Sequence, residues 1–480
     1  MKSPAFDNTY AQLPERFYQA QLPTPVAAPG LIRVNTKLAQ QLGLDPDWLA
    51  SEEGIRVLAG NQIPEGATPI ATVYAGHQFG SWNPQLGDGR AVLLGEIVDP
   101  AGTRFDMQLK GSGPTPYSRG GDGRAPLGPV LREYIVSEAM AALGIATTRS
   151  LAAVTTGEPV YRESELPGAV LTRIAASHIR IGTFEFFAVR KDEDALKALA
   201  DHVIARHYPA AADSSNPYLA LLEAVIKRVA GLVSDWQCVG FIHGVLNTDN
   251  MLLSAETIDY GPCAFMDTYD SAQVYSSIDR GSRYAYNKQP EIAHWNMMVL
   301  AQSLLPLLHE DPEQAVSLAR GALEAFSPQF QQNHLAGMAR KIGLDQAIPD
   351  DEILISDLMG LMEAEALDFT LTFRQLSDPL LHTHPNEALE PWITRWLARC
   401  HDNDSQQPNY ALMQTTNPVC IPRNHLIEAA ITEATDSNDF SAFDQLVEVL
   451  AQPYDAQYIG TKFSLPPAPE DVVLYTFCGT

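Results

Sequence analysis

The spacing of hydrophobic and polar positions divides the chain into a strand-rich first part and a helical second part. Within residues 69–110, short apolar runs stand between Gly-rich turns, and runs at 91–98 and 105–110 flank an Asp-Pro-Ala-Gly-Thr turn. Such runs between turn residues predict a β-hairpin. Further short strands are expected within residues 150–174.

One helix is expected among the strands and several after them. Residues 130–143 have helical composition, and Gly144 follows as a stop signal. Beyond about residue 194 apolar residues recur at three-to-four spacing, which is typical of helices with one buried face. The helices predicted in this way cover residues 194–206, 217–236, 312–326, 350–373 and 440–450. Residues 240–270 interrupt them with turn residues and two short apolar runs, which predict a strand pair.

This order of elements indicates the fold class. A strand-rich lobe with a Gly-rich loop and one helix, followed by a helical lobe with a polar strand pair, is the order found in protein kinases. The sequence therefore predicts an α+β, protein-kinase-like fold with a strand-rich N-lobe and an enlarged, mainly helical C-lobe. We expect an N-terminal extension packed on the core at residues 1–68, the N-lobe at 69–190, and the C-lobe at 191–480, with a catalytic loop at 243–261 and a cysteine-containing tail.

Composition and charge narrow the class of partner. The 480 residues include 58 acidic and 32 basic side chains, for a formal charge of −26. Most of the surface therefore repels nucleic-acid phosphates and anionic membranes. The first residues lack the pattern of a secretory signal, and no stretch is apolar enough for a spanning helix. We expect a cytoplasmic protein with neither nucleic acid nor a membrane as partner.

The five cysteines are too few for a disulfide framework, and none shows the CxxC spacing of a zinc site. Most are expected to be buried as small apolar residues. Cys478 differs because it lies close to the end of the chain, where a thiol is usually accessible. An accessible thiol can be redox active, and a chance cysteine fits that position equally well.

The pentapeptide Gly-Asp-Gly-Arg-Ala occurs twice, at residues 87–91 and 121–125. Glycines let backbone N–H groups approach a phosphate closely. For either loop alone a plain Asp-Gly turn is the alternative. Because the two loops stand on either side of Lys110, phosphate binding is the favoured interpretation.

Lys110 ends the second strand of the hairpin, and Glu133 lies on the helix that follows. In kinases, a strand lysine paired with a helix glutamate is directed onto the triphosphate. The spacing alone is loose, so a solvated lysine is the plain alternative. Arginines also gather in this region: Arg119, Arg124, Arg173 and Arg180. Guanidinium groups bind phosphate oxygens bidentately, although we expect half of the four to pair with surface acidic side chains instead.

The sharpest signal is the segment His243-Gly-Val-Leu-Asn-Thr-Asp-Asn250, with Asp259-Tyr260-Gly261 close behind it. A kinase catalytic loop reads His-Arg-Asp-x-x-x-x-Asn and precedes Asp-Phe-Gly, and its Asn and second Asp hold metal ions. Asn250 and Asp259 stand at those two positions. Amide and carboxylate oxygens are ligands that Mg²⁺ prefers, so a metal site is favoured over a simple turn cap at Asp259.

One kinase residue is absent. Val245 stands where the kinase loop carries its catalytic aspartate, and a valine can neither accept a proton nor orient a hydroxyl. The nearest carboxylate is that of Asp249, which can serve as base only if the substrate approaches from a different direction. An ordinary kinase mechanism is therefore disfavoured.

These residues resemble the selenoprotein O family of pseudokinases. The resemblance covers nearly the whole chain, and its blocks are residues 74–80, 108–119, 243–251 and 417–424. It implies a kinase-like fold in which ATP binds in an inverted orientation with its α-phosphate exposed. It also implies transfer of AMP to Ser, Thr or Tyr hydroxyls of proteins with release of pyrophosphate, and for some bacterial members transfer of UMP from UTP favoured by Mn²⁺.

The resemblance implies a role for each matching residue. Asp249 is the expected proton acceptor, Asn250 and Asp259 are the expected ligands of Mg²⁺ or Mn²⁺, and Glu133 is expected to position Lys110. The expected nucleotide contacts are Gly87, Gly89, Arg90, Lys110, Asp122, Gly123, Arg173, Arg180 and Asp259.

The resemblance also implies a redox role for the tail. Family members often carry selenocysteine near the C-terminus, and Cys478 is similar to its sulfur counterpart. A redox link to the loop after Asp259 is a family theme, and Cys263 is the one cysteine in that loop. A Cys263–Cys478 disulfide is therefore a hypothesis.

Two other functions stay open. Val245 disfavours a phosphotransferase of the same fold but does not exclude it, since a base contributes only about 10²–10⁴-fold to a rate. A non-catalytic ATP-binding scaffold is expected to have lost Lys110, Asn250 or Asp259, and all three are present. Catalysis with ATP, a divalent metal and protein substrates is the favoured function.

Overall fold

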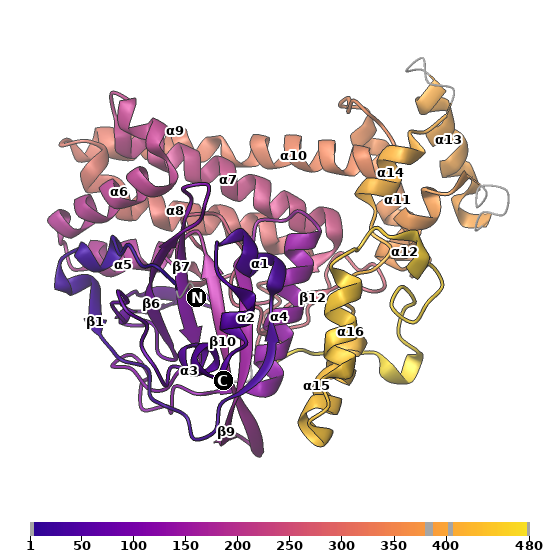
Figure 1. Ribbon diagram of the computed structural model, residues 1–480. Coiled ribbons are helices and arrows are strands. Elements are labelled where there is room, and N and C mark those ends of the chain that lie inside the picture. Colours follow the sequence, from indigo (N-terminus) through magenta and orange to yellow (C-terminus); the bar gives the residue numbers. More distant parts are fainter. Residues whose placement is uncertain (1–3, 380–386, 402–406, 478–480) are drawn as a thin grey trace.

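The computed structural model describes residues 4–379, 387–401 and 407–477. Its first part is built on an eight-stranded sheet whose neighbouring strands are antiparallel (Figure 1). The strands are β1 (Tyr18–Ala20), β2 (Gly30–Val34), β3 (Ile70–Thr72), β6 (Ala91–Val98), β7 (Arg104–Lys110), β8 (Ala125–Pro126), β9 (Arg149–Tyr161) and β10 (Glu165–Ala175). They run in the order β1-β3-β6-β7-β10-β9-β2, and β8 pairs with β10.

The hairpin predicted at residues 91–110 is confirmed by β6 and β7. Its register places Ala91 opposite Lys110, so the lysine at the end of β7 lies beside the loop that precedes β6. On the other side β7 pairs with β10, where Arg173 lies opposite Gln108. The sheet therefore brings Lys110 and Arg173 to neighbouring strands. The strands β9 and β10 are longer than the short strands predicted for residues 150–174.

Helices cover both faces of the sheet. On one face, α1 (Thr36–Gln41), α2 (Pro46–Leu49) and α3 (Glu52–Leu58) pack against apolar side chains of β6, β7, β9 and β10. Each of these short helices begins at a capping side chain, which accepts a hydrogen bond from a backbone N–H of the first turn: Asn35, Asp45 and Ser51. On the other face, α4 (Leu127–Ala142) packs against β9 and β10 and carries Glu133 toward the sheet.

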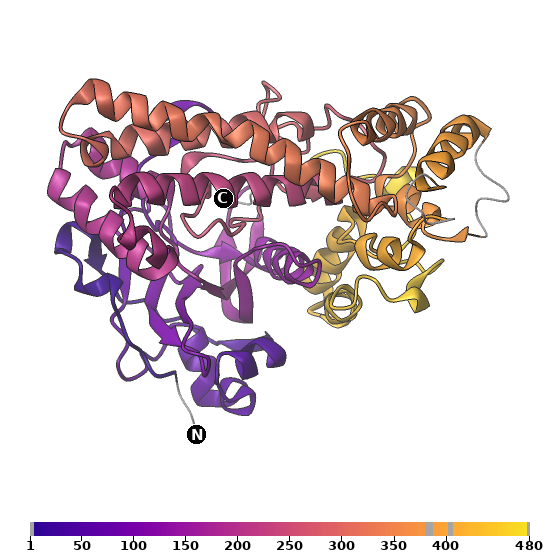
Figure 2. The ribbon, with the colours of Figure 1, turned by 90° about the horizontal axis from the view of Figure 1, so that it is seen from above.

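The second part of the chain is mainly helical. Six of its helices lie along the sheet domain (Figures 1 and 2): α5 (Ile181–Val189), α6 (Glu193–His207), α7 (Pro217–Val239), α8 (Gln289–Leu308), α9 (Pro312–Glu324) and α10 (Phe326–Lys341). The long helix α7 begins with the Asn216 cap and Pro217 and ends at Gly240, whose φ of 71° is left-handed. Its apolar face, which includes Leu222, Val225 and Val229, is buried as its three-to-four spacing predicts.

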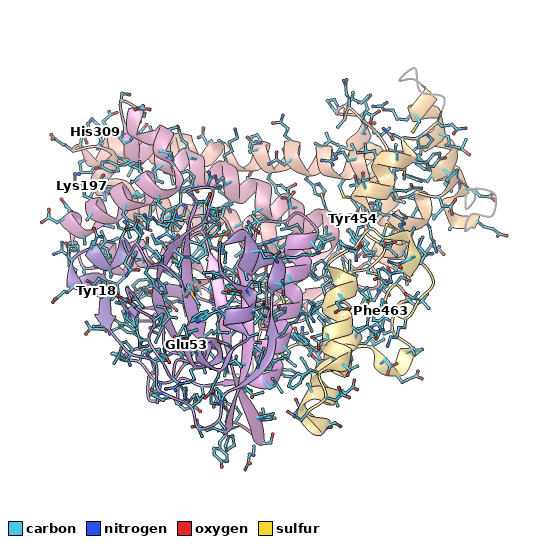
Figure 3. All side chains as sticks on the ribbon, in the orientation of Figure 1. Tyr18, Glu53, Lys197, His309, Tyr454 and Phe463 are labelled. Atoms are coloured by element: carbon cyan, nitrogen blue, oxygen red, sulfur yellow. The ribbon has the colours of Figure 1, made fainter. Side chains whose placement is uncertain are left out.

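The remaining helices form the C-terminal part: α11 (Asp351–Ala364), α12 (Phe369–Leu376), α13 (Glu390–His401), α14 (Tyr410–Thr416), α15 (Asn424–Ser437) and α16 (Ser441–Leu450). The prediction of one helix at 350–373 is wrong. Ala366 has a φ of 50°, which ends the first helix, and the side chain of Asp368 caps the second by accepting from the N–H of Leu371. The helices α15 and α16 pack on α4, and nearby the Tyr454 hydroxyl donates to the carbonyl of Leu143 (Figure 3).

Two small strand pairs lie outside the main sheet and position loops of the candidate active site. The strands β11 (Phe241–Ile242) and β12 (Ala264–Phe265) confirm the predicted pair and enclose the segment that contains the short helix η4 (Thr248–Asn250). The second pair is the hairpin of β4 (Gly76–Gln78) and β5 (Ser81–Asn83). The predicted α+β class is confirmed. Among the described helices, none combines the length and apolar character needed to cross a membrane.

Candidate active site

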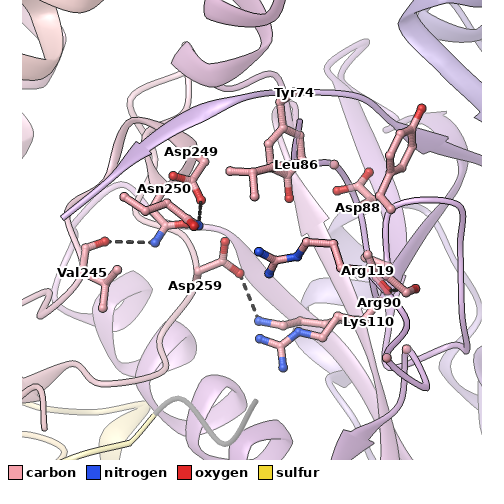
Figure 4. Close-up of a pocket in the computed structure, with 18 of the residues that line it drawn as sticks. Tyr74, Leu86, Asp88, Arg90, Lys110, Arg119, Val245, Asp249, Asn250 and Asp259 are labelled. Atoms are coloured by element: carbon pink, nitrogen blue, oxygen red, sulfur yellow. Dashed lines mark hydrogen bonds and ion pairs between the residues drawn. The ribbon is translucent and has the colours of Figure 1, made fainter. Parts of the chain in front are cut away.

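A cavity of about 750 Å³ lies between the strand-rich part and the loops of the helical part (Figure 4). The predicted residues that line it are Gly87, Gly89, Arg90, Lys110, Arg119, Asp122, Gly123, Arg124, Arg173, Arg180, Asp249, Asn250 and Asp259. They come from two Gly-rich loops, two strands, the start of α5, which Arg180 precedes, and the segment between β11 and β12. The fold thus gathers residues that are far apart in the sequence into one site.

Glu133 stands outside the lining and holds two of its cations in place. Lys110 Nζ donates to Glu133 Oε2, and Arg173 donates to Oε1 through Nε at 2.8 Å and Nη2 at 2.5 Å. Burial favours a neutral glutamic acid, but the charges of Arg173 and Lys110 outweigh it and hold the pKa of Glu133 below its usual value. The carboxylate therefore stays ionised and fixes both cations at the cavity floor.

Asp259 lies at the centre of three cations. Its Oδ1 is 3.0 Å from Lys110 Nζ and 2.7 Å from Arg173 Nη2, and its Oδ2 is 2.8 Å from Arg180 Nη1. Burial acts to raise its pKa, but these three charges hold the pKa of Asp259 well below the usual range. The residue has a φ of 64°, a left-handed conformation that aspartate tolerates better than most residues.

Buried hydrogen bonds hold the loop around Asp259. The imidazole of His243 is almost fully buried, with Nε2 2.9 Å from the carbonyl of Ile258. Burial lowers the pKa of His243, so the neutral ring donates this bond. His243 is therefore a structural residue that fixes the segment just before Asp259.

Asn250 and Asp259 form a donor set that suits a metal ion bound together with phosphates. The amide of Asn250 donates from Nδ2 to the carbonyl of Val245 at 2.9 Å, which leaves its Oδ1 as a ligand atom. The part of the chain that the structure describes contains no cluster of three or more His, Cys, Asp or Glu residues suited to hold a metal. Mg²⁺ commonly binds one or two protein oxygens and completes its shell with substrate phosphates and water. The residues present therefore fit an ion that arrives with a nucleotide.

Asp249 is buried beside these ligands but in a different electrostatic environment. Its Oδ2 accepts a hydrogen bond from Gln78 Nε2 at 3.0 Å, and its Oδ1 is buried without a hydrogen-bond partner among the described residues. Arg180 donates to the main-chain carbonyl of Asp249 rather than to its carboxylate. Burial raises the pKa of Asp249 to about 6, although Gln78 and Arg180 act in the opposite direction. A carboxylate of this kind can accept a proton near neutral pH.

The Gly-rich loops pack where a side chain has no room. A Cβ on Gly87, whose φ is 142°, lies 2.4 Å from the ring of Tyr117, and a Cβ on Gly123, whose φ is 63°, lies 2.1 Å from the carbonyl oxygen of Gly113. Asp122, in the second loop, is bound by Arg162 at 2.9 and 3.1 Å, and this hydrogen bonding lowers the pKa of Asp122. Contacts within the protein therefore hold both loops beside the cavity.

Other lining residues received no role from the sequence, among them Tyr74, Gln78, Asp88 and Tyr117. The guanidinium of Arg180 lies 4.8 Å from the ring centre of Tyr74. Asp88 accepts hydrogen bonds from the N–H and the hydroxyl of Thr72, at 3.0 and 2.7 Å. These bonds attach the first Gly-rich loop to the end of β3. Tyr74 and Gln78 lie in the block 74–80, which resembles the family as a whole, and no local signal marks Tyr117.

Of the two cysteines in the disulfide hypothesis, Cys263 is among the described residues. Cys263 is buried outside the cavity lining, its carbonyl accepts from Arg132 Nη1 at 3.3 Å, and burial raises the pKa of its thiol to about 12. Cys478 lies outside the described residues. The described tail reaches the same loop, because the Thr476 hydroxyl donates to the carbonyl of Pro262 at 2.6 Å. The Cys263–Cys478 disulfide stays a prediction.

Comparison with known proteins identifies the family. Residues 2–451 match the family model described as "Protein adenylyltransferase SelO". Proteins named "Protein nucleotidyltransferase YdiU" are 58% identical over 485 residues in Rhodopseudomonas palustris (strain BisB18) and 57% identical over 486 residues in Bradyrhizobium sp. (strain BTAi1 / ATCC BAA-1182), each alignment covering 99% of both chains. A Rhizobium etli (strain CIAT 652) protein of the same name is 55% identical over 491 residues, which cover 99% of this chain and 97% of the relative. The chain belongs to the SelO adenylyltransferase family, whose members are enzymes named as protein nucleotidyltransferases.

Proposed function

We propose that this enzyme transfers AMP from ATP to Ser, Thr or Tyr hydroxyls of protein substrates and releases pyrophosphate. The observation that carries the proposal is the division of one cavity into two sides. Lys110, Arg173 and Arg180 surround Asp259. Asp249 lies apart from Lys110, on the side of the cavity that also carries Asn250 and Val245 (Figure 4). We also propose that the two parts of the chain are the lobes of a kinase-like fold, at residues 69–190 and 191–480, with residues 1–68 as an extension.

The cationic side suits the phosphates of the nucleotide. The side chains of Arg173 and Arg180 are only 2% and 4% exposed, so phosphates that reach them lie deep in the cavity. Asn250 and Asp259 would hold the divalent metal, which when bound neutralises negative charge on the phosphates. Placing the β- and γ-phosphates at this depth leaves the α-phosphate nearer to Asp249, as the inverted orientation of ATP requires.

The chemical step follows from this placement. The acceptor hydroxyl oxygen attacks the α-phosphorus, and its proton passes to the Asp249 carboxylate. The bond between the α-phosphorus and the oxygen that bridges to the β-phosphate breaks, and pyrophosphate leaves with that electron pair. Lys110, Arg173 and Arg180 are already fixed by Glu133 and Asp259, so they offer preorganised positive charge to the departing group.

Phosphoryl transfer is the main competing reaction, and the position of Val245 argues against it. Its side chain lines the cavity where a kinase presents its aspartate, and its carbonyl binds Asn250. A kinase substrate placed there finds no carboxylate at that residue. The acceptor is better served by Asp249, which belongs to the short helix η4.

Two labels of ATP distinguish the reactions. The purified protein is incubated with Mg²⁺ or Mn²⁺ and with ATP labelled at either the α- or the γ-phosphate, and label in protein is measured. We expect α-label in protein and its loss in Asp259→Ala. γ-Label without α-label would establish a kinase and overturn the proposal. A parallel reaction with α-labelled UTP shows whether UMP is also transferred.

A further inference from the structure

The β4–β5 hairpin is fastened to the segment that carries Asp249. The N–H of His77 donates to the hydroxyl of Thr248 at 2.8 Å, and the N–H of Phe79 donates to Asn247 Oδ1 at 3.0 Å. These bonds join the hairpin to the two residues that precede Asp249 in the chain. The hairpin therefore sets the position of the start of η4.

One side chain of the hairpin reaches the carboxylate itself. Gln78 Nε2 donates to Asp249 Oδ2 at 3.0 Å, and it is the one side-chain donor to this carboxylate in the described part of the chain. The other oxygen, Oδ1, faces the backbone of Gly76 so closely that a Cβ there lies only 2.6 Å away. Oδ2 keeps a second lone pair, whereas Oδ1 is closed off by the hairpin.

The hairpin is also anchored on its far side, so Gln78 extends from a fixed support. The ring of His77 binds the buried carboxylate of Glu185 on α5, with Nδ1 2.5 Å from Oε1. The same ring lies against Trp82 and Trp295, with ring centres 4.9 and 5.2 Å away. Gln78 therefore leaves a rigid turn and lines the cavity beside Asp249.

We propose that Gln78 is a positioning residue, which holds the Asp249 carboxylate so that Oδ2 meets the acceptor hydroxyl. This inference rests on the proposed function, because it assigns Asp249 to the acceptor side of the reaction. Gln78 makes no contact with the cation cluster of Lys110, Arg173 and Arg180 among the bonds that the described residues form. Its loss should therefore affect transfer while nucleotide binding stays intact.

The test compares two variants of Gln78. Gln78→Met keeps the length of the side chain but removes the N–H donor. Gln78→Asn keeps the amide on a side chain that is one methylene shorter. The matched control is Gln85→Met, since Gln85 is exposed and outside the cavity lining. The probes are α-labelled ATP with Mn²⁺ and casein as a hydroxyl-rich acceptor, and label is counted in all protein. The ATP dissociation constant and the melting temperature are measured for each variant.

We expect both Gln78 variants to lose on the order of 10- to 100-fold in rate at saturating ATP, as befits one hydrogen bond to a charged group. The ATP dissociation constant and the melting temperature should match those of the unmodified protein and of Gln85→Met. Transfer at the normal rate in Gln78→Met overturns this inference alone, and so does a parallel loss of ATP affinity or stability, which indicates a merely structural role. No α-label from the unmodified protein overturns the proposed function as well.

Discussion

Nη1 of Arg180 lies 2.8 Å from Oδ2 of Asp259 and donates at the same time to the main-chain carbonyl of Asp249. One guanidinium therefore joins the loop of the proposed base to the proposed metal ligand. The face of the same group lies over the ring of Tyr74. Arg180 is thus a direct link between the two aspartates.

Replacing Arg180 by lysine should disturb this junction although the charge is kept. An ammonium group lacks the planar guanidinium whose Nη1 donates to both acceptors while the group lies over the ring of Tyr74. We expect Arg180→Lys to transfer AMP at least about tenfold more slowly, the loss of one charge-assisted hydrogen bond. The initial rate of α-label transfer measures this. Arg190→Lys is the control, because Arg190 lies outside the cavity lining, and equal rates in both variants would contradict the expectation.

Removing the charge of Asp249 should slow transfer without preventing nucleotide binding. Asp249→Asn keeps the size of the side chain but cannot take the hydroxyl proton, and general-base catalysis contributes about 10²–10⁴-fold. We expect the turnover rate to fall by that factor while the ATP dissociation constant stays the same. Asp201→Asn, at an exposed residue on α6, serves as control. A variant at Asp249 that retains full turnover would show that the base lies elsewhere.

Glu256 should give the protein a dependence of stability on pH. Its carboxylate accepts from the N–H of Ala176 at 3.0 Å and from the Ser254 hydroxyl at 2.8 Å, and burial raises the pKa of Glu256 from 4.5 to about 7. The folded state therefore holds a proton that the unfolded chain has released, and stability falls as pH rises from about 4.5 to about 7. In Glu256→Gln this loss should disappear, since the amide carries no charge.

The measurement is the urea midpoint at pH 5 and pH 8. We expect the unmodified protein and the control Glu223→Gln, at an exposed position, to lose more stability between the two pH values than Glu256→Gln does. The same pH dependence in all three proteins would rule out Glu256 as its source.

Arg423 should be a major source of stability in the C-terminal part. Its side chain is fully buried and binds Asp267 and Asp368, the latter at 2.8 Å. Arg423→Met leaves two carboxylates close together without their cation, and breaking a buried pair from one side costs about 3–5 kcal/mol. Chemical denaturation should show a loss of this size. Adding Asp267→Asn and Asp368→Asn should restore part of it, and a loss below about 1 kcal/mol would contradict the assigned role.

Elements that depend on local pattern could be predicted from the sequence. The strands β6 and β7 are short runs bounded by turn signals, and α7 has a continuous apolar face with Asn216 and Gly240 at its ends. The segment from His243 to Asp259 is contiguous, so its spacing shows which side chains can share a site. The fold class and the centre of the candidate site follow from such signals.

Features that depend on contacts between residues far apart in the sequence could not be predicted. Gln78 and Asp249 are 171 positions apart, and nothing near Gln78 indicates that its amide reaches a carboxylate. The break between α11 and α12 depends on the left-handed backbone of Ala366, a residue type that ordinarily favours helix. The positions of β1 and β2 in the sheet depend on the strands with which they pair, and their short sequences do not specify a partner.

The two outermost strands of the sheet come from a single early stretch, residues 18–34. The strand β1 pairs with β3, whereas β2 pairs with β9, so this stretch leaves the ribosome well before its second partner is made. The sheet cannot be complete until β10, which lies between β7 and β9 and ends at Ala175, has also emerged. Once in place, the strands are only three and five residues long, and such short borders give another chain little to pair with. One short stretch thus forms both borders of the sheet and limits its association with other chains.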